Sequence, residues 1–121
     1  RNLTIVAPLE FSFENARASE LFDFLLAAFV SDYMGEKMPL ENSGWRTMGQ
    51  MARDGKVPYF SVYGRRGGFS AELKELIRRG IVEQRLFAHE RGRGGEITKL
   101  RVAYDRETVR GSVNKKIKFN G

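Results

Sequence analysis

The sequence predicts an α+β fold, in which a helical core is followed by a two-stranded β-hairpin and an additional helix lies near the N-terminus. Three observations predict it. Apolar residues recur at helical spacing in several segments before Gly80. After that glycine the spacing changes to that of strands, and a glycine-rich segment separates two such runs. The chain has 121 residues, enough for one compact domain and too few for two ordinary ones.

The N-terminal segment is expected to form an arm and then a long apolar helix. Residues 3–9 are apolar and partly β-branched, and the proline at position 8 favours a short edge strand or an extended arm over a long central strand. A helix is predicted over residues 16–34, with Asn15 as its N-cap and Gly35 at its end.

The apolar stripe of this helix is wider than the stripe that a surface helix needs. Two interpretations stay open: the helix is buried in its own domain, or it also packs against a second copy of the chain. In the second case a homodimer would use one set of side chains, namely Leu21, Phe22, Leu25 and Phe29.

Three shorter helices are predicted to follow, over residues 45–53, 59–63 and 71–79. Ser70 is a good N-cap for the last of them. Residues 64–68, Gly-Arg-Arg-Gly-Gly, should separate the second helix from the third, because glycines inside a helix cost about 1 kcal/mol each relative to alanine. We therefore expect a basic loop between two helices.

The last third of the chain is predicted to contain strands. Residues 81–87 and 97–104 carry β-type patterns, and the glycine-rich residues 89–96 join them as a hairpin. The tail beyond Asp105 contains the basic run Lys-Lys-Ile-Lys, and the pattern allows either a helix or a frayed end.

Basic charge is concentrated in the second part of the chain. Before Arg46, three basic residues stand against seven acidic ones, whereas from Arg46 onward eighteen stand against eight, within a formal net charge of +6. Such asymmetry indicates a polyanionic partner, most often nucleic acid. A well-solvated basic surface explains the charge equally well.

The order of elements between residues 45 and 104 resembles the winged helix-turn-helix family, and looks most like archaeal and bacterial transcription regulators. Three stretches carry the likeness: MGQMARDGKVP at 48–58, SVY at 61–63 and LKELIRRGIVE at 73–83. In the family, the last kind of stretch leads into a two-stranded wing.

The resemblance implies three parts: an N-terminal arm and apolar helix at 1–44, which is a possible dimerisation element, a winged helix-turn-helix domain at 45–104, and a basic C-terminal tail at 105–121. It also implies double-stranded DNA binding, sequence-specific or general, in a transcription regulator. A protein-interaction module and an RNA-binding domain are the alternatives, since winged-helix domains also serve as docking units and RNA would use the same basic face.

The glycine-arginine segment at 64–68 has the chemistry that DNA requires. Glycines let the backbone approach phosphates, Arg65 and Arg66 provide forked donors, and Ser70 begins a helix whose N-terminus favours anions. A linker whose arginines only face water is the alternative. Arg91 and Arg93 repeat this composition at the expected wing tip.

Residues near the expected helix-turn-helix complete the candidate set. Arg46 and Thr47 would contact the DNA backbone, Lys56 lies in the turn, and Ser61 with one of the tyrosines on the short helix would reach the duplex. The expected DNA contacts are Arg46, Thr47, Lys56, Tyr59, Ser61, Tyr63, Arg65, Arg66, Ser70, Arg91 and Arg93.

Other classes of function find little support in the sequence. His89 is the only histidine and there is no cysteine, so neither a metal site nor a disulfide is expected. No nucleophile, base and acid occur in a supporting context, and no phosphate-binding or dinucleotide fingerprint is present. We expect a cytoplasmic non-enzyme without cofactor, metal or membrane segment. The chain begins at Arg1 rather than Met, so a fragment of a longer protein and a complete chain are both open.

Overall fold

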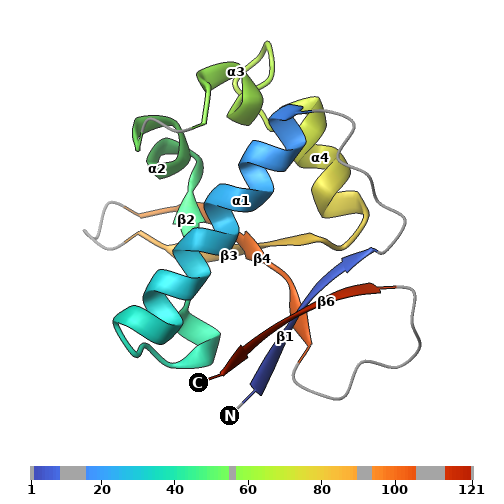
Figure 1. Cartoon of the computed structure of the whole chain (residues 1–121). Coiled ribbons are helices and arrows are strands. Elements are labelled where there is room, and N and C mark those ends of the chain that lie inside the picture. Colours follow the sequence, from blue (N-terminus) through green and yellow to red (C-terminus); the bar gives the residue numbers. More distant parts are fainter. Residues whose placement is uncertain (1, 9–15, 55–56, 90–93, 106–113, 121) are drawn as a thin grey trace.

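The computed structural model describes residues 2–8, 16–54, 57–89, 94–105 and 114–120, and side chains only in 16–54, 57–89 and 94–103. Figure 1 shows the elements. They are β1 (Asn2–Pro8), α1 (Ala16–Val30), the π-helical turn η1 (Ser31–Gly35), the 3-10 turn η2 (Leu40–Asn42), β2 (Arg46–Thr47), α2 (Met48–Arg53), α3 (Tyr59–Val62), α4 (Ala71–Arg78), β3 (Val82–Ala88), β4 (Glu96–Val102), β5 (Tyr104–Asp105) and β6 (Asn114–Asn120). The predicted α+β class is confirmed.

Helix α1 is the centre of the core. It packs on α3, α4 and β4, and Figure 1 shows it crossing in front of the β2-β4-β3 sheet. The proposed dimer contacts Leu21, Phe22, Leu25 and Phe29 are all buried in this core, with exposed fractions between 0% and 6%. The expectation that they form a dimer surface is therefore wrong in this fold. The wide apolar stripe of α1 is explained by burial on several sides within one chain.

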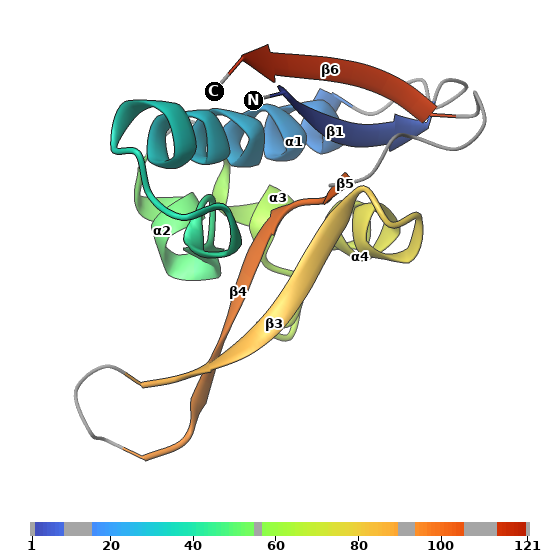
Figure 2. The same cartoon turned by 90° about the horizontal axis from the view of Figure 1, so that it is seen from below.

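The predicted hairpin is confirmed as β3 and β4, which pair antiparallel from Val82 opposite Val102 to Ala88 opposite Glu96. The short strand β2 pairs with the other edge of β4, so the sheet order is β2-β4-β3. Leu100 and Val102 face the helices and are fully buried. Figure 2 shows that the hairpin extends well beyond the helices.

A second sheet joins the two ends of the chain. Strand β1 is its central strand, pairing antiparallel with β6 along its whole length and with β5 at Thr4 and Ile5. The expected edge strand or arm is thus a central strand, and Pro8 is tolerated because it is the last residue of β1. The basic tail, expected as a helix or a frayed end, contributes β6.

The start of α2 differs from the prediction. The helix was expected from Trp45 but begins at Met48, because Thr47 and Gln50 form a capping box in which each side chain accepts a backbone N–H of the other residue. Trp45 precedes the helix and is buried, and Arg46 lies in β2.

The remaining helices begin and end near their predicted positions. Pro58 precedes the single turn of α3, Ser70 caps α4, and Gly80 ends α4 with a φ of +74°. Because α1 shares its core with α3, α4 and β4, residues 16–44 do not form a separate packing unit. Among the residues with described structure, no helix has the length and apolar character needed to cross a membrane.

Candidate nucleic-acid interface

Residues 64–68 form a defined turn between α3 and α4. The N–H of Gly67 donates to the carbonyl of Gly64 at 3.1 Å, and the N–H of Gly64 donates to the carbonyl of Gly68 at 2.7 Å. Tyr63 and Phe69 pair as an isolated β-bridge below it. Gly67 has a φ of +80°, as the third residue of a three-residue hairpin connection requires. Residues 64–68 therefore form a small, defined hairpin rather than an irregular linker.

This hairpin presents two arginines at its tip. Arg65 and Arg66 are exposed, and neither makes an ion pair with a residue in the described ranges. Close packing enforces the geometry at the base, since a Cβ on Gly64 would lie 3.0 Å from the carbonyl oxygen of Phe69. Two guanidinium groups are thus held on a short backbone turn and remain available to an anion.

Exposed aromatic rings lie beside the turn. Phe60 is 71% exposed and Tyr59 is 57% exposed, and their rings meet edge to face at 5.3 Å. Tyr63 stacks on Tyr59 with ring centroids 4.7 Å apart. We call the set Tyr59, Phe60, Tyr63, Arg65 and Arg66 the aromatic–arginine surface. The sequence analysis selected four of these five residues. It did not select Phe60, whose exposure is apparent only from the structure.

A hollow of about 350 Å³ adjoins this surface. Its lining consists of Phe60, Tyr63 and Arg65 together with Arg17, Gly64 and residues 70–72. Two of these residues form an ion pair, in which a guanidinium nitrogen of Arg17 lies 4.0 Å from a carboxylate oxygen of Glu72. Phe60 and Arg65 therefore face a common space, although one lies on α3 and the other in the turn.

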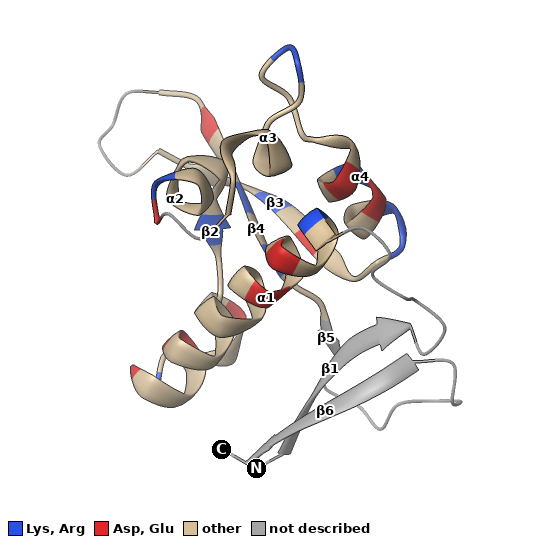
Figure 3. Ribbon diagram, turned by 45° about the horizontal axis from the view of Figure 1, so that its top comes forward, with Lys and Arg blue, Asp and Glu red and all other residues tan. Residues whose placement is uncertain are grey.

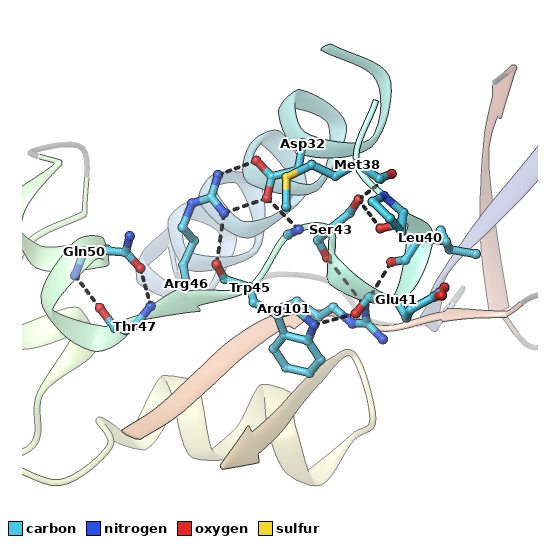
Figure 4. Close-up of polar contacts among 12 residues, drawn as sticks. Asp32, Met38, Leu40, Glu41, Ser43, Trp45, Arg46, Thr47, Gln50 and Arg101 are labelled. Atoms are coloured by element: carbon cyan, nitrogen blue, oxygen red, sulfur yellow. Dashed lines mark hydrogen bonds and ion pairs between the residues drawn. The ribbon is translucent and has the colours of Figure 1, made fainter. Parts of the chain in front are cut away.

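Arg46, expected to contact phosphate, has a structural role. Its guanidinium donates two hydrogen bonds to the carboxylate of Asp32, at 2.8 and 2.9 Å, and a third to the carbonyl of Trp45 (Figure 4). Asp32 also accepts the N–H of Gly44. The bond from Arg46, reinforced by Gly44, holds the pKa of Asp32 below its usual value of 3.8, although burial opposes the shift. Arg46 is thus held by a carboxylate from η1, a contact that sequence spacing does not reveal.

Three hydroxyl groups in the candidate set are also occupied or buried. Thr47 caps α2 through its Oγ1. Ser70 is buried, donates to the carbonyl of Ser61 and accepts the N–H of Leu73. Ser61 is fully buried, and no described residue partners its hydroxyl. Ser61 and Ser70 are therefore not available to DNA, and the hydroxyl of the half-buried Thr47 is engaged in the helix cap, so these expectations are corrected.

Three expected contacts cannot be placed, since Lys56, Arg91 and Arg93 lie outside the described residues. The described part of the hairpin does carry basic side chains that the sequence analysis did not select. Arg85 is exposed and lies over the ring of Trp45 at 4.8 Å, and Lys99, opposite Arg85 in the sheet, lies over Phe87 at 4.9 Å. Cross-strand placement, and not a motif, brings these cations together.

Charge on α4 is largely compensated within the helix. Glu75 accepts hydrogen bonds from Arg78 and Arg79 at 2.6 Å, and these bonds lower the pKa of its carboxyl group to about 2. Figure 3 shows the blue tip of the turn between α3 and α4 standing clear of the red segments of α1 and α4. Within the described residues, the turn is therefore one place where positive charge is not compensated by an acidic neighbour.

A second hollow, of about 430 Å³, lies where η1 and η2 meet the hairpin. Its lining includes Trp45, Phe87, Lys99 and the Asp32–Arg46 pair. Across the described residues, no group of three or more histidine, cysteine, aspartate or glutamate side chains could hold a metal ion.

Comparison of the chain with family models, with curated proteins and with solved structures gave no match.

Proposed function

We propose that this chain binds double-stranded DNA through the aromatic–arginine surface, as a winged-helix-like domain of a transcription regulator. The observation that carries the proposal is the turn at 64–68, which fixes Arg65 and Arg66 at its tip, exposed and without an acidic partner in the described chain. Arginine on a glycine-flanked backbone suits phosphate and base edges alike.

The arrangement of the helices and the β2-β4-β3 sheet supports this proposal. Helices α1 to α4 followed by a long hairpin are compatible with a winged helix, in which the β3–β4 hairpin is the wing. The turn and the described ends of the wing both lie away from the β5-β1-β6 sheet in Figures 1 and 2. Arg85 on the wing adds an exposed cation. One elongated duplex can therefore contact both segments.

A salt titration tests the proposal. If about six phosphates are neutralised, the logarithm of the association constant should fall with the logarithm of the salt concentration with a slope near −5. Replacing Arg65→Ala together with Arg66→Ala should reduce the magnitude of that slope by about 2 and weaken binding to any duplex. Fluorescence anisotropy of a labelled duplex at several salt concentrations measures both.

Arg78→Ala is the matched control. Arg78 is 68% exposed but bound to Glu75, so its removal should change the slope little. A flat salt response of the unaltered protein, or equal slopes for the unaltered protein and the double variant, would contradict the proposal.

The exposed rings of Tyr59 and Phe60 also suit a protein-interaction module, which is the second candidate function. It predicts that the double arginine variant keeps full function whereas Phe60→Ala loses it. The double arginine variant separates the two candidates, because DNA binding predicts a loss of function for it and a docking role predicts none.

A further inference from the structure

Helix α3, which precedes the turn, is too short to read the major groove as a recognition helix does. Helix α3 has four residues, and at 1.5 Å per residue it is about 6 Å long. The major groove of B-form DNA is about 12 Å wide and is read by longer helices or by two-stranded ribbons. Tyr59 and Phe60 occupy the exposed side of α3, and neither offers the forked donors that bases in the major groove require.

The turn itself has dimensions that suit the minor groove, which is about 6 Å wide. Only positions 65 and 66 carry side chains within residues 64–68, because the other three are glycines. The tip is closed by the hydrogen bonds of Gly64 with Gly67 and Gly68, so the backbone at the tip is compact. A narrow backbone with two long cationic side chains can enter a groove that excludes a helix.

Arginine side chains at the tip of the turn favour A·T-rich DNA sequences. Minor grooves of A·T-rich DNA are narrow and strongly negative, and they attract inserted arginines. The guanidinium group is more weakly hydrated than the ammonium group of lysine, so less hydration is lost on entry. In G·C pairs, the exocyclic N2 amino group of guanine projects into the minor groove and changes its pattern of donors and acceptors.

Phe60 adds an apolar element at the edge of the turn. It is 71% exposed, belongs to no part of the buried core, and lines the same hollow as Arg65. Proteins that bind the minor groove often place an apolar side chain against or between the base steps there. An arginine pair beside an exposed phenylalanine combines both elements.

We infer that the aromatic–arginine surface contacts duplex DNA from the minor-groove side and favours A·T base pairs. The inference rests on the proposed function, because it names the groove and the base composition that this surface recognises. It concerns the turn between α3 and α4 and is independent of the wing.

Inosine substitution separates the two grooves. An I·C pair presents the minor groove of A·T and the major groove of G·C, because inosine lacks the N2 amino group. Three duplexes of equal length, with A·T, G·C or I·C pairs at the centre, are titrated against the protein by anisotropy. The A·T and I·C duplexes should bind alike, and about tenfold more tightly than the G·C duplex.

The outcomes distinguish this inference from the proposal on which it rests. If I·C binds like G·C, or if all three duplexes bind alike, the minor-groove inference is wrong while DNA binding stands. If no duplex binds, the proposed function itself fails. An RNA duplex of matching sequence should bind more weakly, because its minor groove is wide and shallow; tighter binding of RNA would overturn the inference.

Two variants test the named side chains. Arg65→Lys with Arg66→Lys keeps the charge, so binding should persist while the preference for A·T over G·C falls to about twofold. Phe60→Ala should weaken binding to the A·T duplex, and its exposure makes an effect on folding small. Circular dichroism verifies the fold of both variants. An undiminished preference in the lysine variant would contradict the role assigned to the guanidinium groups.

Discussion

Arg46 and Asp32 form a largely buried pair that joins η1 to β2. Their side chains are 22% and 10% exposed, and two hydrogen bonds connect them. A second cation, Arg101, is almost fully buried, lies over the ring of Trp45 at 4.3 Å, and pairs with Glu83. These residues hold the η1–η2 segment and the sheet in place, and so they support the site without belonging to it.

The role of Arg46 gives a prediction at the residue scale. Arg46→Ala should lower the free energy of unfolding by about 3 kcal/mol, because it leaves the carboxylate of Asp32 without its main partner. The affinity for duplex DNA, measured where the variant is still folded, should change by less than about twofold. Urea titration and anisotropy supply the two measurements. A large loss of affinity with unchanged stability would instead assign Arg46 to the DNA contact.

The same pair should make stability depend on pH. Since Arg46 lowers the folded-state pKa of Asp32, the pair stabilises the protein above the ordinary pKa of 3.8. That contribution is lost as the pH falls through the lowered pKa. Arg46→Ala should therefore lose less stability than the unaltered protein on acidification through this range; equal losses would show that the pair contributes little.

At the scale of elements, the turn at 64–68 depends on one of its two adjacent glycines and not on the other. Gly67 has a φ of +80°, a conformation that costs a residue with a side chain about 1 kcal/mol or more, whereas Gly68 has no positive φ and no atom within 4 Å of an added Cβ. The two positions are neighbours in the sequence, but only Gly68 can accept a side chain without backbone strain.

This difference predicts opposite results for two alanine substitutions. Gly67→Ala should lower the free energy of unfolding by about 1 kcal/mol and weaken DNA binding, because the tip that carries the arginines is displaced. Gly68→Ala should leave both nearly unchanged. Thermal unfolding and anisotropy of the two variants measure this. Equal affinity of both variants and the unaltered protein would show that the shape of the turn has no part in binding.

Much at the element scale followed from local chemistry in the sequence. Glycines at 64–68, the cap at Ser70 and the end at Gly80 predicted where α4 begins and ends, and the change of period predicted the hairpin. Helix α2 begins three residues after the predicted Trp45, because the capping box of Thr47 and Gln50 outweighs the apolar periodicity that suggested Trp45. Local patterns thus locate elements well where a glycine or a cap marks their ends.

At the scale of the whole molecule, the features that the sequence did not reveal are contacts between distant residues. Pairing of β1 with β6 joins opposite ends of the chain, and the Asp32–Arg46 pair spans fourteen positions. Neither has a local signature. The burial of Leu21 and Phe29 within one chain likewise depends on what packs around α1, which one helix pattern cannot show.

For the same reason, the sequence predicted only part of the candidate site. Arg65, Arg66, Tyr59 and Tyr63 lie together because they are close in sequence, and their composition was sufficient to select them. Ser61 and Ser70 were selected by the same local argument, but packing of α3 against α4 buries both. Exposure, which depends on the whole fold, separates the two groups.

The most direct measurement is a titration of the isotope-labelled protein with a short DNA duplex, followed by NMR spectroscopy. We expect the largest shifts at the backbone amides of Gly64, Gly67 and Gly68 and at the side-chain Nε–H groups of Arg65 and Arg66. The side-chain Nε–H of Arg46 should stay unperturbed. Shifts that avoid residues 59–68 and gather elsewhere would contradict the account.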